Sequence, residues 1–163
     1  MTSVEEAVTG TQLRTFMRSW ATGVAVVTSS QVDTPVGCTV NAFTSISLSS
    51  PLLLISLAET NRTLTAITAC EAFGVNLLSA RQRRLAERFA TGLGDRFAGV
   101  PYRMVCGVPV LTGAMAVAAC EVVHTTSLAD HVLLFGRPLW LGPVTTTDPV
   151  VFFGGRYRAI SPG

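Results

Sequence analysis

Residues 36–57, VGCTVNAFTSISLSSPLLLISL, decide the fold of this chain. Residues 36–40 are mostly β-formers and predict a strand, which leads into an irregular polar turn over residues 41–45. A short strand follows, and after a Ser-Ser-Pro break the continuous apolar run of residues 52–57 predicts a buried strand. Small Thr, Ser and Asn side chains hydrogen-bond locally and hold unusual backbone in place. The segment can therefore present backbone groups to a flat polar ligand, although composition alone favours an ordinary polar loop between core strands.

The residues before this stretch predict one helix and one strand. Residues 1–10 look like a loose leader, Thr11 is the expected N-cap of the helix, and Gly23 can end it. Apolar residues at helical spacing define one face of this helix, which we expect to be buried: Leu13, Phe16, Met17 and Trp20. Residues 24–28 are rich in valine and predict a buried strand.

A second helix is predicted directly after the central stretch. Asn61 or Thr63 is expected to cap it, and it should run to about Cys70. A helix start that combines free N–H groups, an arginine and a hydroxyl is a ready anion site. Simple capping, with Arg62 in solvent, is the alternative.

The middle of the chain predicts a strand and then a basic helix. Residues 71–78 form the strand, and Ser79 is expected to cap a helix over residues 80–91. Its arginines predict a mainly solvated face, and Leu85 and Phe89 are expected to pack inward.

The remainder predicts a loop and three further strands. Residues 91–109 are rich in glycine and predict a long surface loop, a kind of segment that is commonly functional. Residues 114–127 and 131–144 predict two long strands with a tight connection, and residues 150–158 predict a last one. Several short strands without βαβ alternation predict an antiparallel barrel with peripheral helices. Because no G-x-G-x-x-G motif follows a strand, a Rossmann domain is not expected.

The composition bounds the kind of protein. The 163 residues are enough for one domain. They are 48% hydrophobic and only 13% charged, against about 25% charged in an average globular chain. This deficit predicts apolar surface hidden at a subunit interface. A net charge of +2, without a basic stripe interleaved with aromatic residues, does not favour a nucleic-acid partner.

Targeting and metal signals are weak. The first ten residues carry Glu5 and Glu6 and no apolar core, so we do not expect a signal peptide. The sequence contains no run of about 18 apolar residues, so we do not expect a membrane helix. The four cysteines form no C-x-x-C pair, so free thiols in a reducing cytoplasm are expected and a zinc site is not.

Eight blocks in this order resemble the short-chain flavin reductases, and together they cover nearly the whole chain. They are FMRSWATGVAVVT (16–28), GCTVNAFTSISLSSP (37–51), NRTLTAI (61–67), FGVNLLS (73–79), RLAERFA (84–90), DRFAG (95–99), ADH (129–131) and GGRYR (154–158). Each block alone is weakly specific, whereas eight in register are a specific signal. The resemblance implies an FMN-binding split-barrel fold, which is mainly β and has a Greek-key antiparallel barrel.

The resemblance also implies a set of flavin-binding residues. The polar edge of the isoalloxazine ring would bond the backbone of Thr39, Val40, Asn41 and Ala42, with Thr44 and Ser45 continuing the contact. Ser56, Leu57 and Ala58 would line the ribityl chain, and Asn61, Arg62 and Thr63 would hold the phosphate. Phe97 or Phe89 would close one side of the pocket, and Arg88 would reach the ligand. Tyr157 and Arg158 would support the nicotinamide dinucleotide.

His131 would be the residue beside the stacked nicotinamide, following Asp130 in the motif of the family. A turn histidine bonded to Asp130 or to a carbonyl group is the alternative. Most members have glycine where this chain has Ala129. If that position needs a positive φ, alanine costs about 1 kcal/mol or more, and the turn is reshaped.

By resemblance, the expected function is an NAD(P)H-dependent flavin reductase. It would use FMN or FAD with NADH or NADPH as hydride donor, form a homodimer, and supply reduced flavin to a partner monooxygenase. One alternative keeps the fold but uses a tightly held flavin in a biosynthetic oxidase or oxygenase. Another is a non-enzymatic split barrel that binds flavin or haem.

Overall fold

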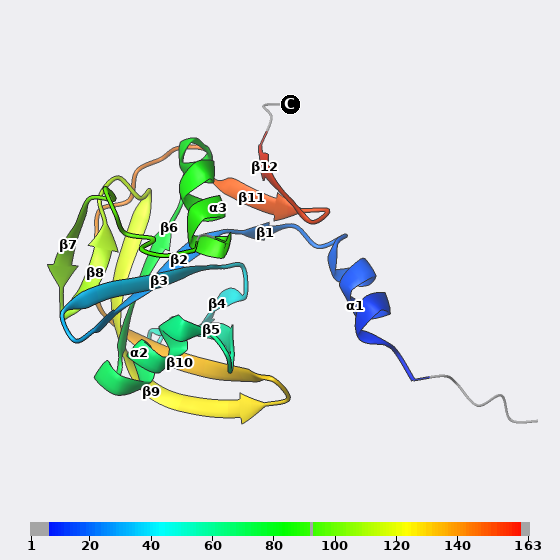
Figure 1. Ribbon diagram of the computed structural model, residues 1–163, viewed down its shortest axis with the longest axis horizontal. Helices are drawn as coiled ribbons and strands as arrows, with labels where there is room; N and C mark the ends of the chain where they lie inside the picture. The colour runs from blue at the N-terminus through cyan, green and yellow to red at the C-terminus, as the bar shows by residue number, and fades with distance from the viewer. Residues whose placement is uncertain (1–6, 92, 161–163) are drawn as a thin grey trace, which may run out of the picture.

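The computed structural model, which describes residues 7–91 and 93–160, is built mainly from antiparallel strands (Figure 1). The strands are β1 (Thr22–Gly23), β2 (Ala25–Gln31), β3 (Thr34–Val40), β4 (Phe43–Ser47), β5 (Leu52–Ala58), β6 (Ala72–Leu77), β7 (Tyr102–Val105), β8 (Val108–Leu111), β9 (Ala116–Leu128), β10 (His131–Leu141), β11 (Val150–Phe153) and β12 (Arg156–Ala159). The helices are α1 (Gly10–Met17), α2 (Arg62–Cys70), the 3-10 turn η1 (Ala80–Gln82) and α3 (Arg83–Thr91).

Seven strands form the main sheet in the order β3-β2-β6-β9-β10-β5-β4. The two outermost strands, β3 and β4, follow each other in the chain and are separated only by Asn41 and Ala42. The sheet therefore curls until its two edges meet at this turn, where the Ser56 N–H donates to the Ala42 carbonyl at 3.1 Å. The edges do not close along their length, so the predicted split barrel is confirmed.

The inside of the barrel is an apolar core, and a buried polar residue, Asn76, lies on the opposite face of β6. The core residues include Val27, Ile55, Phe73 and Leu134, all fully buried. Asn76 is also fully buried, and it donates to the Val26 carbonyl at 2.9 Å and accepts from the Leu111 N–H at 2.7 Å. Because its amide is bonded on both sides, burial costs little, and the amide ties β8 to the main sheet.

A second core lies between the main sheet and α3. It contains Phe89, Phe97, Leu111 and Val150, which are at most 5% exposed. Phe89 faces β3, and a Cβ added at Gly37 would lie 3.0 Å from the Phe89 ring. Glycine at position 37 therefore lets α3 pack directly on the edge strand β3.

The N-terminal helix differs from its prediction. It begins at Gly10 with Thr9 as the N-cap, rather than Thr11, so the predicted leader shrinks; residues 1–6 of that leader lie outside the described residues. Figure 1 shows α1 projecting away from the main sheet. The apolar face predicted to be buried is exposed, by 72% at Phe16 and 65% at Trp20, because α1 contacts only the edge of the domain.

Three segments contain more strand than predicted. The Gly-rich stretch 91–109 includes β7 and the start of β8, which pair as a hairpin around Cys106 and Gly107. The polar turn predicted over 41–45 is only two residues long, since β4 begins at Phe43. The predicted last strand is a hairpin, β11–β12, which joins β1 in a separate three-stranded sheet.

Candidate functional site

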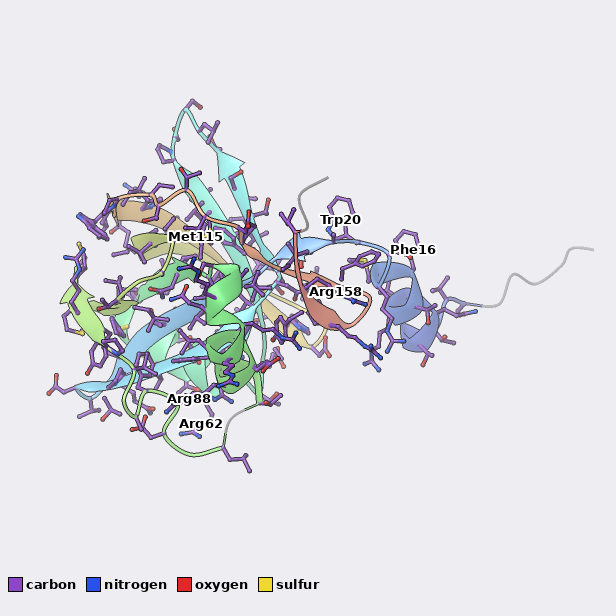
Figure 2. All side chains as sticks on the ribbon, turned by 90° about the horizontal axis from the view of Figure 1, so that it is seen from above. Phe16, Trp20, Arg62, Arg88, Met115 and Arg158 are labelled. Carbon is purple, nitrogen blue, oxygen red and sulfur yellow. The ribbon has the colours of Figure 1, made fainter. Side chains whose placement is uncertain are left out.

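The β3–β4 turn opens into a large cavity. Its volume is about 730 Å³, and the Asn41–Ala42 turn, Thr44 of β4 and Ser56 of β5 line it. Trp20 and Met115 also line it, and Figure 2 labels both. Most of its lining is apolar, with a few polar groups at the turn. Such a cavity is suited to a flat ring with one polar edge.

A second cavity lies at the other end of β3. Its volume is about 240 Å³, and residues from three segments line it, including Gly37, Arg62, Thr63, Arg96 and Phe97. The Arg96 guanidinium donates to the Gly37 carbonyl through Nη1 at 2.9 Å. The lining carries two arginines and one carboxylate, Asp95, so its net charge is positive, and together with the helix N-terminus this suits a phosphate.

The start of α2 is arranged more tightly than predicted. Asn61 is the N-cap, and its Oδ1 accepts from the Thr63 N–H at 2.9 Å. Thr63 is only 2% exposed, whereas Arg62 is exposed. The predicted cap at Asn61 is therefore formed, and Arg62 lies at the mouth of the cavity, where the anion site stays a prediction.

Cys38 of β3 lies behind this corner. Burial raises the pKa of its thiol, and hydrogen bonds from Thr63 and Asn61 and the charge of Arg96 oppose the rise. The same interactions show that β3 and the start of α2 are in direct contact. The thiol remains protonated at neutral pH, so it packs as a small neutral group rather than a nucleophile.

Strand β3 connects the two cavities. It pairs only with β2 in the main sheet, so half of its backbone groups face away from any strand partner in the described part of the chain. The Thr39 hydroxyl donates to the Ala86 carbonyl at 2.6 Å, which leaves its backbone rather than its side chain for a ligand. Val40 is buried toward the core. Gly37 and Asn41 are four residues apart, or about 13 Å along a strand.

The remaining residues predicted on β4 and β5 fall into two groups. Leu57 is 2% exposed and belongs to the barrel core, so only its backbone can face a ligand. Ser45 is exposed and Ala58 is half-buried, and neither lines these cavities. The sheet brings Ser56 and Ala58 onto one face, two residues apart.

Arg88 and Phe97 organise the loop after α3. The Arg88 guanidinium donates through Nη2 to the carbonyls of Asp95 and Ala98 at 3.2 and 2.7 Å. Phe97 packs edge-on against Phe89, with ring centroids 5.0 Å apart. Phe97, not Phe89, lines the 240 Å³ cavity, while Arg88 holds the loop that carries Arg96 and Phe97.

The C-terminal hairpin supplies Tyr157 and Arg158. Tyr157 packs on Phe152 with centroids 5.4 Å apart and lines a small cavity of about 90 Å³ together with Thr39, Val40 and Asn41. Burial and the nearby charge of Glu87 raise the pKa of Tyr157, so its hydroxyl stays neutral. Arg158 lies exposed on β12, away from Arg62 and the cavity that it lines (Figure 2).

His131 lies on the same face of the sheet as part of the large cavity. It is paired with Ala58, and Leu133 with Ser56, so His131 and Ser56 share the outer face of β10 and β5. Its Nδ1 lies 2.8 Å from the Asp130 carboxylate. The hydrogen bond with His131, a backbone hydrogen bond and the His131 charge lower the pKa of Asp130.

Ala129 has the strained backbone that its sequence position suggested. Its φ is +54°, and it is the first of two residues in the turn between β9 and β10. Asp130 is not among the residues with a positive φ. A turn with positive φ only at its first central residue favours glycine there, so alanine keeps the hairpin geometry at a cost in stability.

Three arginines near the cavities are not among the site residues predicted from the sequence: Arg96, Arg14 and Arg18. Arg96 was within the DRFAG block, and its position next to Phe97 was the available signal. Arg14 of α1 and its C-cap residue Arg18 are four residues apart, a spacing that places two cations on one helix face. No group of His, Cys, Asp or Glu in residues 7–91 and 93–160 could hold a metal ion, and no helix there is long and apolar enough to cross a membrane.

Comparison with known proteins identifies the class of this chain. A family model described as a flavin reductase like domain matches residues 17–161. The reductase subunit HsaB of a flavin-dependent monooxygenase from Rhodococcus jostii (strain RHA1) is 32% identical over 158 residues, which cover 96% of this chain and 81% of that protein. Actinorhodin polyketide dimerase of Streptomyces coelicolor is 34% identical over 150 residues, covering 91% and 85%.

A solved structure gives the same result. The NADH:FAD oxidoreductase SgcE6 of Streptomyces globisporus C-1027, solved in complex with NAD and FAD fragments, matches with a TM-score of 0.87 at 33% identity over 93% of each chain. The split-barrel fold of this chain, with its large cavity and its basic corner, is thus that of an oxidoreductase that transfers hydride from a nicotinamide to a flavin. The chain is a member of the flavin reductase family, as its eight sequence blocks indicate.

Proposed function

We propose that this chain binds a flavin along β3, with the ring at the Asn41–Ala42 turn and the phosphate beside Arg62, and reduces it with NAD(P)H. The observation that carries this proposal is the placement of two complementary cavities at the two ends of one edge strand. The larger is mainly apolar and the smaller is flanked by Arg62 and Arg96. FMN and FAD both fit, because each carries a phosphate at the end of the ribityl chain.

The residues present suit each part of the flavin. Backbone groups of Thr39, Asn41 and Ala42 would meet the polar edge of the ring, with Ser56 at the start of the ribityl chain. The exposed guanidinium of Arg62 would pair with the phosphate. Thr63 would form part of the cavity wall, and its hydroxyl would not bond the phosphate, because the residue is buried.

The flavin supplies the redox chemistry when bound, since its ring accepts a hydride from a stacked reduced nicotinamide. The protein has to position two rings and keep water away, and it needs no side-chain acid or nucleophile for that step. His131, on the same sheet face as Ser56, would align the nicotinamide. Tyr157 would hold the Asn41 side of the pocket through its packing on Phe152.

The reduced flavin would pass to a separate monooxygenase. Support comes from relatives such as HsaB, which is named as the reductase subunit of a flavin-dependent monooxygenase. The four cysteines are free, which agrees with work in a reducing cytoplasm. The exposed apolar face of α1 and the low charge content support a homodimer.

One assay tests the reductase function directly. Purified protein is mixed with NADH or NADPH and an excess of free FMN or FAD, and absorbance of the reduced nicotinamide is followed. Multiple turnovers that depend on added flavin are expected. A yellow protein that consumes no reduced nicotinamide would contradict the proposal.

A second candidate function is a biosynthetic oxidase or oxygenase that keeps its flavin. It is favoured by the similarity to actinorhodin polyketide dimerase and by Ala129 at a position that prefers glycine. Gel filtration after loading separates the two candidates. A reductase that shares its flavin should lose it on dilution, whereas the alternative should elute with one flavin per chain.

A further inference from the structure

A third sizeable cavity lies between α1 and the β11–β12 turn. Its volume is about 390 Å³, and Arg14, Arg18, Phe152, Phe153, Gly154 and Gly155 line it. It also shares four lining residues with the 730 Å³ ring cavity, namely Met17, Trp20, Thr22 and Asn41. A ligand seated at the Asn41 turn can therefore extend into this second space.

The cavity is positively charged. Arg14 of α1 and Arg18, the C-cap of α1 with helical φ and ψ, are four residues apart, so their side chains leave the same face of the helix. Neither is ion-paired with a carboxylate of residues 7–91 or 93–160. Two like charges at this spacing disfavour the helix, and an anion bound between them would remove that penalty.

The β11–β12 turn fixes Arg18 at the cavity. Gly154 and Gly155 both have positive φ, of 62° and 76°, which forms the two-residue turn that joins Phe153 to Arg156. The Gly154 N–H donates to the Arg18 carbonyl at 3.0 Å. A Cβ at position 155 would lie 3.5 Å from Arg18 Nε, so the guanidinium lies against this turn.

We propose that Arg14 and Arg18 bind the diphosphate of the reduced nicotinamide dinucleotide. This inference rests on the proposed function, in which the flavin runs from Asn41 toward Arg62 and its own phosphate lies at the far end of β3. The nicotinamide would stack on the flavin ring in the 730 Å³ cavity, and its diphosphate would enter the adjoining arginine cavity. Trp20 and Phe153 would offer apolar surface to the adenine.

The adenosine diphosphate half of FAD carries the same chemistry. It would reach this cavity only if the flavin were bound in the opposite direction, with its phosphate toward α1. The experiment therefore has to separate a loss of dinucleotide binding from a loss of FAD binding.

The test compares the Arg14→Gln/Arg18→Gln double variant with the wild type, and uses Arg84→Gln as control because Arg84 is an exposed arginine of α3 that lines none of these cavities. FMN reduction is measured with NADH and with reduced nicotinamide mononucleotide, which lacks the adenosine phosphate. The KM for NADH should rise about tenfold or more, while the KM for the mononucleotide stays within about twofold. Arg18→Lys should recover part of the loss.

A binding measurement does not depend on activity. In a Trp140→Phe background, Trp20 is the remaining tryptophan, and it lines the cavity. ADP titrated onto flavin-free protein should change Trp20 fluorescence, with an affinity about tenfold weaker in the double variant and unchanged in Arg84→Gln. The affinity for FMN should be the same in all three proteins.

Two results would overturn the inference while the reductase function stands. One is an unchanged KM for NADH and unchanged ADP binding in the double variant. The other is a weaker affinity for FAD with an unchanged KM for NADH, which would assign the arginines to the flavin. A wild-type protein that reduces no flavin would instead refute the proposed function, and the ADP titration would still report on the arginines.

Discussion

Ala129 is held in a backbone conformation that an L-residue adopts at a cost. Its φ of +54° comes from the tight turn between two long strands, whose pairing leaves no room for a relaxed loop. The long ladder of β9 and β10 offsets the strain. Local strain that the surrounding structure maintains is common near functional sites, and this turn carries His131.

We expect Ala129→Gly to stabilise the protein. Glycine adopts the positive φ without steric cost, so the free energy of unfolding should rise by about 1 kcal/mol. Urea denaturation followed by circular dichroism measures the change. The matched control is Ala119→Gly, in the fully buried middle of β9, which should lose stability. A loss of stability in Ala129→Gly would show that the turn is not strained.

His131 is expected to act on the dinucleotide rather than on the flavin. His131→Ala should leave flavin affinity within about twofold, because the flavin contacts proposed here lie on β3, β4 and β5. It should raise the KM for NAD(P)H or slow flavin reduction about tenfold, as for one lost contact. Stopped-flow reduction of the flavin-loaded protein at several NADH concentrations separates the two effects. If the His131→Ala variant reduces flavin at the wild-type rate and with the wild-type affinity for NADH, then His131 is a turn residue bonded only to Asp130.

At the scale of elements, the start of α2 is where capping and ligand binding meet. Asn61 uses its side chain on the helix, and Thr63 is buried, so Arg62 is the one residue of the three with a side chain available for a phosphate. The rim of this cavity gains a second cation from Arg96, which the loop after α3 carries.

We expect Arg62→Gln to weaken FMN binding by about tenfold, the value of one charge-assisted contact. Lumiflavin, which has no phosphate, should bind both proteins equally. Fluorescence quenching of each flavin gives the affinities, and Arg84→Gln again serves as control. Equal losses for FMN and lumiflavin would mean that the substitution disturbs the fold of the corner.

Element boundaries were predictable where the signal was local. The cap at Asn61, the extent of α2 and the two long strands follow from side-chain chemistry and alternation in the sequence. The β11–β12 hairpin was read as one strand, although Gly154–Gly155 is a two-residue turn signal that could have revealed it. The exposure of the apolar face of α1 could not be predicted from the sequence, because helical periodicity defines such a face but does not say what covers it.

The site was predictable only in outline. The family resemblance implied flavin contacts by Asn41, Ala42, Thr44 and Ser56, and these four residues line one cavity. The sequence did not indicate that Thr63 would be buried or that Arg88 would bind loop carbonyls, since both outcomes depend on packing between segments distant along the chain.

At the scale of the whole molecule, the exposed face of α1 is the feature that a single copy does not explain. Leu13, Phe16 and Trp20 are more than half exposed, and no described element covers them. A second copy is the occupant that we propose, in line with a chain that is only 13% charged.

We expect light scattering to return twice the mass of one chain at micromolar concentration. Phe16→Asp should shift the protein toward the monomer, because it places a charge in the centre of the apolar face. Val32→Asp is the control, since Val32 is 93% exposed in the β2–β3 turn, away from α1. A monomeric wild-type protein with flavin bound would contradict the homodimer.

The small sheet of β1, β11 and β12 also affects how the protein is made. It pairs Thr22 with Phe152, near opposite ends of the chain, and it supports the arginine cavity. On the ribosome, the seven-stranded sheet has all its strands once Leu141 has emerged, but β1 has no partner until β11 follows. A nascent chain therefore completes its barrel before it completes the surface around α1, and the proposed assembly of two copies through that surface would have to wait for release of the last strands.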